Sequence, residues 1–173
     1  MGNRKNKLLV RWKEKFHLST EEALEVVDHW RSKGESIVFT NGCFDLLHIG
    51  HIQYLLEAKS LGDRLVLGIN TDESVRKLKG KGRPVNPLDD RMKMIAALWM
   101  VDLVIPFEED TPKELIQKIK PDTLVKGGDY PIDQIVGAEE VLKSGGKVFS
   151  LGFSEGYSSS IMIERIIKIK NNE

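Results

Sequence analysis

The sequence predicts an α/β fold in which five parallel strands form one doubly wound sheet with helices on both faces. Two observations lead to this prediction. Short runs of apolar and β-branched residues recur along the 173-residue chain, and segments with a helical spacing of apolar residues separate them. Continuous apolar runs are typical of strands buried on both faces of a parallel sheet. The five runs are 36–40, 64–69, 102–107, 122–127 and 146–151.

Three helices are expected in the first half of the chain. Segment 19–34 has a serine–threonine cap signal at its start and Gly34 at its end. After the first strand, apolar residues at positions 49, 52, 55 and 56 form one helical face. The third helix spans 87–98, where two early aspartates suit the positive end of the helix dipole.

Two more helices are expected in the second half. In segment 111–119, Thr111 is placed as the N-cap and Pro112 at the first helical position. The last helix follows three serines at 158–160, whose hydroxyls can cap its first turn. We expect residues 1–34 to form a basic arm and a helix, and residues 35–173 to form the α/β domain.

The composition excludes several classes of protein. Lys and Arg number 26, as do Asp and Glu, so the basic surplus usual in a nucleic-acid binder is absent. The single cysteine, Cys43, excludes an internal disulfide framework and fits a reducing, cytoplasmic setting. No apolar run approaches the ~20 residues that span a membrane. The apolar residues of 24–30 and of the last helix could pack within the chain or form a homo-oligomer contact.

Two of the four histidines, His48 and His51, stand three residues apart where the first strand passes into a helix. In doubly wound folds, ligands bind at the carboxyl ends of the strands, at the point where the strand order reverses. Gly42 allows a tight turn there, and Gly50 leaves space beside the histidines for a phosphate. Free amides at a helix start attract anions, and imidazoles can donate hydrogen bonds to a phosphoryl group.

Two other interpretations of the histidines were weighed. The first is that they are packed or exposed side chains without a function. That interpretation suits a lone histidine better than two histidines with a glycine between them at the start of a helix. Metal ligation is the second alternative, because residues at i and i+3 share a helical face. No third ligand follows at a zinc-like spacing, so this alternative is minor.

The stretch "NGCFDLLHIGH" (41–51) resembles the H-x-G-H signature of the cytidylyltransferase-like nucleotidyltransferases. Four later stretches, in the same order, are similar to those of the heptose-1-phosphate adenylyltransferases. They are "GINTDESVRKLKGKGRPVNPLDDR", "VDLVIPFEEDTPKELI", "KPDTLVKGGDY" and "EGYSSSIMIERI". The resemblance covers residues 36–167 and implies a Rossmann-like fold. It also implies the stand-alone form of an enzyme that elsewhere is fused to a sugar kinase.

The implied reaction joins ATP and D-glycero-β-D-manno-heptose 1-phosphate to give ADP-heptose, a lipopolysaccharide inner-core precursor, and pyrophosphate. The resemblance implies that His48, His51 and Lys79 are catalytic. Lys79 lies in the basic stretch 76–83, expected to be a flexible loop, where Lys77 and Lys81 compete for the same role. The residues implied to bind the nucleotide or its phosphates are Thr40, Asn41, Gly42, Cys43, Phe44, Gly50, Arg91, Gly127, Asp129, Ser158, Ser159 and Ser160.

Several of these residues also have purely structural interpretations. Arg91 could lie on a charged helix surface, Asp129 could stabilise a turn, and the serines could only cap a helix. Asp45 and Asp72 are candidates to contact Mg²⁺ or substrate, although an N-cap role suits Asp72 better. Mg²⁺ is expected to arrive with the nucleotide, without dedicated protein ligands. A covalent role for Cys43 is rejected, because a phosphate acceptor needs no thiolate.

Three other functions remain on the sequence alone. The nearest is a CTP-dependent enzyme acting on glycerol 3-phosphate or a related polyol phosphate. A nucleotide-binding regulatory module without catalysis is the second, and the complete set of site residues argues against it. An RNA-binding fragment is disfavoured by the zero net charge.

Overall fold

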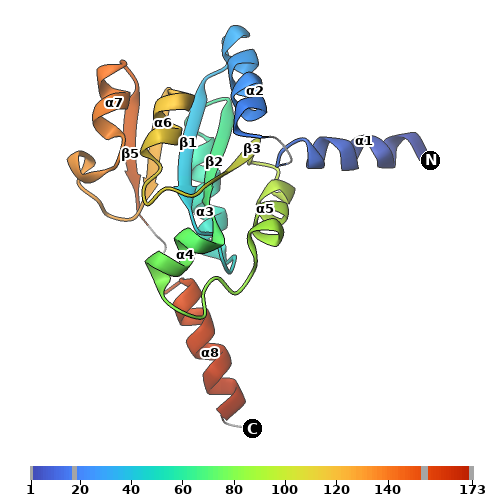
Figure 1. Ribbon diagram of the computed structural model, residues 1–173, viewed down its shortest axis with the longest axis vertical. Helices are drawn as coiled ribbons and strands as arrows, with labels where there is room; N and C mark the ends of the chain where they lie inside the picture. The colour runs from blue at the N-terminus through green and yellow to red at the C-terminus, as the bar shows by residue number, and fades with distance from the viewer. Residues whose placement is uncertain (1, 17–18, 153–155, 172–173) are drawn as a thin grey trace.

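The computed structural model describes residues 2–16, 19–152 and 156–171. Its centre is a five-stranded sheet in the order β3-β2-β1-β4-β5, and all four pairings are parallel (Figure 1). The predicted fold class is confirmed, and the predicted strands differ from the observed ones only at their ends. The strands are β1 (Ile37–Gly42), β2 (Arg64–Asn70), β3 (Leu103–Phe107), β4 (Thr123–Gly127) and β5 (Lys147–Leu151).

The strand order reverses between β1 and β4. From β1 the chain adds β2 and then β3 on one side, and afterwards returns to place β4 and β5 on the other. Because the strands are parallel, Gly42 at the end of β1 and Gly127 at the end of β4 lie at the same edge of the sheet. This edge contains the topological switch point, where the sequence predicts a ligand.

Neighbouring residues of each strand point to opposite faces of the sheet and build two hydrophobic cores. Phe39 is in register with Val66 of β2 and Leu124 of β4, and all three belong to one core. Val38, one residue earlier, is in register with Leu65, and both belong to the other core. Both faces of the sheet are therefore buried, which explains the continuous apolar runs in the sequence.

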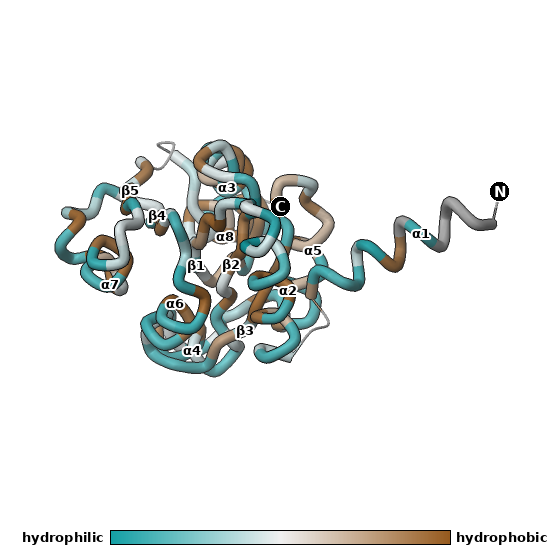
Figure 2. The backbone as a smooth tube through the Cα atoms, turned by 90° about the horizontal axis from the view of Figure 1, so that it is seen from above, coloured by the Kyte–Doolittle hydropathy of each residue, from teal (hydrophilic) through white to brown (hydrophobic). Residues whose placement is uncertain are grey.

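Helices cover both faces. The core with Phe39 receives side chains from α2, α6 and α7, and the core with Val38 receives them from α3 and α5. Helix α1 leads away from the body of the protein in both views (Figures 1 and 2), and α8 projects from it in Figure 1. The helices are α1 (Gly2–Lys13), α2 (Thr20–Ser32), α3 (Ile49–Lys59), α4 (Asp72–Lys79), α5 (Leu88–Ala97), α6 (Lys113–Ile119), α7 (Ala138–Lys143), α8 (Ser159–Asn171) and the short 3₁₀ helix Ile132–Gln134.

The structure corrects the sequence at two helix starts. The stretch expected to be a flexible basic loop contains α4, whose N-cap is Thr71 and not Asp72. The Thr71 hydroxyl accepts the Ser74 N–H at 3.4 Å. In α6, Pro112 occupies the N-cap position and no side chain caps the helix, so the predicted Thr111 cap is wrong.

The N-terminal segment is fastened to the end of α5. Trp12 donates its indole N–H to the carbonyl oxygen of Lys93 at 3.2 Å. The Lys15 ammonium donates to the carbonyl oxygens of Leu98 and Val101 at 3.2 and 2.7 Å. Within the described ranges, no helix combines the length and the apolar character that a membrane span requires.

Helix α2 has the expected capping box, and this gives a test of the fold. The Ser19 hydroxyl accepts the Glu22 N–H, and the Glu22 carboxylate accepts the Ser19 N–H. Replacing Ser19 with Ala should lower the free energy of unfolding by about 1 kcal/mol, measured by urea denaturation. The control is Ser32→Ala, because the exposed Ser32 hydroxyl donates only to the carbonyl oxygen of His29 in the same helix. An equal loss in both variants would contradict the capping role.

Candidate active site

A cavity of about 240 Å³ opens at the carboxyl ends of β1 and β4. We call it the phosphoryl cavity. It receives residues from the end of β1, the first turns of α3 and α8, the last residue of α4 and the end of β4. Its lining residues are Asn41, Gly42, Cys43, Phe44, His51, Tyr54, Lys79, Lys126, Gly127, Tyr130 and Ser159. The structure thus brings many of the predicted site residues together at the switch point.

The two histidines lie against each other at the start of α3. His48 occupies the N-cap position and His51 follows in the first turn. Their rings stack with centroids 3.7 Å apart and planes inclined by 23°. A Cβ atom on Gly50 would come within 3.1 Å of His48 Nδ1, so the glycine makes room for the His48 ring itself. Phe44 supports the pair, with its ring centroid 5.1 Å from that of His51.

Burial keeps both imidazoles neutral near pH 7. Burial, with smaller contributions from the charges of His48 and Lys79, lowers the pKa of His51 to about 4. Burial and Lys79 also lower the pKa of His48. Nδ1 of each ring is buried without a hydrogen-bond partner among the described residues, which leaves Nε2 as the nitrogen that can reach a ligand. A neutral imidazole can donate an N–H to a phosphoryl oxygen as charge builds on it.

Lys79 is the lysine of the basic stretch that reaches the phosphoryl cavity. It ends α4, lines the cavity, and its charge acts on both histidines and on Cys43. Lys77 instead forms an exposed ion pair with Glu73 at 3.4 Å. Lys81 is exposed and does not line the cavity. The geometry therefore favours Lys79 among the three lysines.

The three serines have three different environments. Ser158 caps α8, since its hydroxyl accepts the Ile161 N–H at 3.1 Å. Ser159 is buried, donates to Leu46 O at 3.3 Å and lines the phosphoryl cavity. Ser160 is exposed. The structural and ligand-binding interpretations of this motif thus apply to different serines.

Thr40, which the sequence predicts to bind the nucleotide, does not line the phosphoryl cavity. Its side chain is completely buried, and its hydroxyl hydrogen-bonds to the hydroxyl of Tyr54. Tyr54 also donates to Val125 O at 3.3 Å, so the hydroxyl pair ties β1 and α3 to β4. Burial raises the pKa of Tyr54 to about 12, which keeps it protonated.

Arg91 is predicted to meet phosphates, and in the structure its side chain contacts other parts of the protein. Its side chain is 0% exposed, which also excludes the alternative of a charged helix surface. Its guanidinium donates to the carbonyl oxygens of Cys43 at 2.7 Å, Asn70 at 2.9 Å and Asn86 at 3.0 Å. It also forms an ion pair with Asp72 at 2.7 Å. We call these contacts the Arg91 clamp.

Both candidate carboxylates are engaged by arginines. Asp72 belongs to the Arg91 clamp. Asp45 is buried and accepts hydrogen bonds from the Arg83 side chain at 2.6 Å and from the N–H groups of Val85 and Asn86 at 2.8 and 3.0 Å. Burial alone would raise the pKa of Asp45, but these hydrogen bonds outweigh it and lower the pKa. In the structure both carboxylates thus serve to hold arginines, and a contact of either with Mg²⁺ or substrate remains a prediction.

The remaining predicted residues differ in position. Gly42, Cys43 and Phe44 line the phosphoryl cavity, and burial raises the pKa of the Cys43 thiol. A Cβ atom on Gly42 would come within 2.8 Å of the Phe44 ring, so a side chain there would displace it. Asp129 is exposed and does not line the cavity. Within the described part of the chain, no cluster of three or more His, Cys, Asp or Glu residues could hold a metal ion.

The sequence prediction gave no role to three cavity residues: Tyr54 of α3, Lys126 and Tyr130. Lys126 and Tyr130 belong to the stretch "VKGGDYP", in which the sequence prediction assigned roles only to Gly127 and Asp129. Lys126 stands one residue before the end of β4. Its position beside the switch point is the feature of the sequence that indicates a place in the site.

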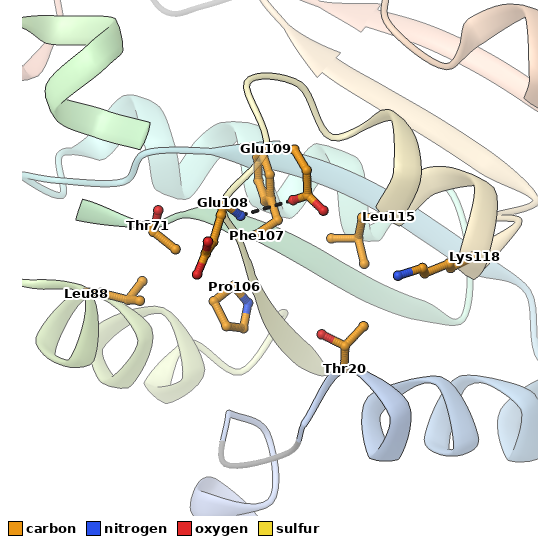
Figure 3. Close-up of a pocket in the computed structure, with 9 residues that line it drawn as sticks. All are labelled: Thr20, Thr71, Leu88, Pro106, Phe107, Glu108, Glu109, Leu115 and Lys118. Atoms are coloured by element: carbon orange, nitrogen blue, oxygen red, sulfur yellow. Dashed lines mark hydrogen bonds between the residues drawn. The ribbon is translucent and has the colours of Figure 1, made fainter. Parts of the chain in front are cut away.

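A larger cavity of about 580 Å³ lies beside the edge strand β3 (Figure 3). Leu88, Pro106, Phe107 and Leu115 give it apolar walls, and Glu108, Glu109 and Lys118 place charges around it. None of the predicted site residues lines it. The histidine pair therefore identifies the smaller cavity as the candidate active site.

The Arg91 clamp gives a stability prediction. Replacing Arg91 with Met leaves three carbonyl oxygens without their donor and should lower the free energy of unfolding by about 3 kcal/mol or more. Lysine keeps the charge but has no planar fork, so Arg91→Lys should also destabilise the protein substantially. Chemical denaturation measures both. A fully stable Arg91→Lys variant with only a raised KM for nucleotide would restore the phosphate-binding interpretation.

The buried histidine gives a pH prediction. As the pH falls from 7 to 5, the unfolded chain protonates His51 near its ordinary pKa of about 6.5, whereas the folded protein does not until about 4. The unfolded state therefore binds more protons, and the protein loses stability, on the order of 1 kcal/mol after allowance for partial exposure.

His51→Gln removes this titration, so its stability should fall less between pH 7 and pH 5 than that of the wild type. Urea denaturation at the two pH values measures the difference. His29→Gln, at an exposed position on α2, is the control and should follow the wild type. An identical pH dependence in wild type and His51→Gln would show that His51 is not held neutral.

Comparisons with known proteins agree with this geometry. Residues 39–165 match the family model described as Cytidylyltransferase-like. The bifunctional protein HldE of Vibrio parahaemolyticus is 53% identical over 152 residues, which are 87% of this chain and 32% of the relative. The protein of the same name from Pseudomonas fluorescens is 52% identical over 160 residues, 92% of this chain and 33% of the relative. The chain thus spans about a third of the length of these curated relatives.

Two solved structures share the fold. A lipopolysaccharide core biosynthesis protein from Thermoplasma volcanium is 31% identical with a TM-score of 0.57, covering 72% of this chain and 99% of its own. A pantoate–β-alanine ligase from Francisella tularensis has the same TM-score at 16% identity, over 81% of this chain and 67% of its own, and shows the fold alone. With its family model matched over most of its length, this chain belongs to the cytidylyltransferase-like family.

Proposed function

We propose that this protein transfers AMP from ATP to D-glycero-β-D-manno-heptose 1-phosphate, giving ADP-heptose and pyrophosphate. The observation that carries the proposal is the neutral, stacked pair of His48 and His51 beside the phosphoryl cavity. Two preorganised donors at a helix start suit a reaction in which negative charge shifts onto phosphate oxygens.

The chemistry requires positioning and charge stabilisation. An oxygen of the acceptor phosphate attacks the α-phosphorus of ATP, a new P–O bond forms, and the bond to the oxygen bridging to the β-phosphate breaks. Pyrophosphate leaves with that bonding pair. The acceptor oxygen is already ionised near pH 7, so no protein base and no covalent intermediate are needed. The protein holds both reactants in line and stabilises the departing charge.

Separate residues support separate parts of this reaction. His48 and His51 would donate to the α-phosphate through Nε2. Lys79 at the cavity rim and Ser159 at the start of α8 would meet the leaving pyrophosphate. Magnesium would neutralise triphosphate charge. With Asp45 and Asp72 engaged by arginines, the metal would be held through phosphate oxygens and water and not by dedicated carboxylates.

The identities of the sugar and of the nucleotide are proposed from similarity to other proteins. The ordered motifs resemble the heptose-1-phosphate adenylyltransferases, about half of the residues match the HldE proteins, and a 31% identical structure is titled a lipopolysaccharide core biosynthesis protein. The name of the matched family model favours CTP as the nucleotide of the second candidate, and the acceptor of that candidate is glycerol 3-phosphate or a related polyol phosphate. A cytoplasmic location remains a prediction.

The test is pyrophosphate release with Mg²⁺ from ATP or CTP, each paired with the heptose 1-phosphate or glycerol 3-phosphate. We expect turnover with ATP and the heptose phosphate alone. His48→Ala should lower kcat by about 10²–10³. Lys79→Met should also impair turnover, whereas Lys77→Met, at an exposed ion-paired position, should retain it.

The other results would be decisive as well. Turnover with CTP and glycerol 3-phosphate would favour the second candidate and leave the histidine roles in place. Folded protein that binds ATP but turns over no acceptor would reject the enzyme as proposed and favour a regulatory module. Full activity in His48→Ala would remove the observation on which the mechanism rests.

A further inference from the structure

A second cavity of about 240 Å³ adjoins the phosphoryl cavity. We call it the side cavity. The two cavities share three lining residues, Asn41, Lys126 and Tyr130. The other residues of the side cavity come from the start of α6, from β4 and from the segment after it: Pro112, Leu124, Val125, Gln134, Ile135 and Val136. The protein therefore has two adjoining compartments with Lys126 at their boundary.

Lys126 is a partly buried cation with no counterion among the described residues. On β4 it follows Leu124 by two residues, so its side chain leaves the sheet on the same face as Leu124. It forms no hydrogen bond and no ion pair with the described residues through its ammonium group, and burial lowers its pKa. Such a charge weakens the fold unless an anion binds to it, and cations of this kind are typical of functional sites.

The proposed reaction supplies that anion. Two phosphate groups of like charge must come into contact before the acceptor oxygen can attack the α-phosphorus, and their repulsion is strong in a cavity with little water. In-line displacement also requires the acceptor to approach from the side opposite the leaving pyrophosphate. The residues suited to pyrophosphate, Lys79 and Ser159, line only the phosphoryl cavity. The side cavity is the compartment that remains for the acceptor.

We propose that the side cavity is the acceptor subsite and that Lys126 binds the acceptor phosphate at the boundary with the nucleotide. The inference rests on the proposed function and adds to it a specific residue and compartment. Asn41, Gln134 and the Tyr130 hydroxyl offer hydrogen bonds to a polyol. Leu124, Ile135 and Val136 offer apolar contact to its C–H groups, a combination usual in small-molecule sites.

The first experiment needs no knowledge of the acceptor. Wild type, Lys126→Met and Lys81→Met are saturated with α,β-methylene-ATP and Mg²⁺, which occupies the nucleotide site without transfer. Inorganic phosphate is then titrated in and its binding is followed by calorimetry. We expect saturable phosphate binding in the wild type and in Lys81→Met, whose lysine is exposed and lines neither cavity. Lys126→Met should bind phosphate at least ~10-fold more weakly.

Two further readouts separate this role from a structural one. The Kd for α,β-methylene-ATP should change less than about 3-fold in Lys126→Met, because the lysine serves the acceptor. The melting temperature of the free protein should stay equal or rise, since methionine fills the same space without an unpaired charge. Lys126→Arg should recover part of the phosphate affinity, because the cation is restored.

The failure of this inference is distinguishable from the failure of the proposed function. If the wild type turns over no acceptor, the proposed function fails, and the phosphate titration still decides the role of Lys126. The inference is overturned if the nucleotide-saturated wild type binds no phosphate, if Lys126→Met binds it normally, or if that variant loses nucleotide and phosphate affinity equally. With an acceptor that does turn over, Gln134→Leu should raise its KM several-fold and leave the KM for ATP unchanged.

Discussion

The buried guanidinium of Arg91 is the constraint on which the site geometry depends. It lies where the chain leaves β1 and β2, and its donors hold the carbonyl oxygens of Cys43 and Asn70 in fixed positions. Cys43 directly follows β1, and Asn70 is the last residue of β2. A side chain with several donors in one plane can satisfy both and Asp72 together, which a lysine cannot do. The turn that leads to the histidine pair therefore starts from a rigid base.

A second arginine–aspartate pair completes this base from the other side of the turn. Asp45 is buried within the stretch between β1 and α3 and holds Arg83, Val85 and Asn86 of the segment that connects α4 to α5. The same segment provides Asn86 O to the Arg91 clamp. Charged residues that the sequence suggests as ligand contacts, Asp45 and Arg91, thus fix the positions of the loops. The histidines and lysines of the cavity remain available to the substrates.

The sequence allowed prediction of features that depend on local spacing. Apolar runs identified the five strands because both faces of the sheet are buried, and His48, Gly50 and His51 could be placed because strand, turn and helix follow one another directly. The surroundings of individual site residues, in contrast, depend on contacts between distant residues. Whether Arg91 faces a phosphate or the interior is decided by Cys43 and Asn70, and whether Thr40 is free is decided by Tyr54. Lys126 was missed because a single lysine in a strand carries no pattern.

The distribution of charge across the site fits a reaction between two anions. Protonated histidines would bind both reactants tightly in the ground state, with little gain in the transition state. Burial and Lys79 prevent this by keeping the imidazoles neutral, so that they act as oriented dipoles at the phosphorus where charge develops. The full positive charges, Lys79 and Lys126, both border the phosphoryl cavity, but only Lys126 also borders the side cavity. The two lysines thereby attract the acceptor phosphate and the leaving pyrophosphate. The α-phosphorus itself is contacted by the neutral histidines through hydrogen bonds of fixed direction.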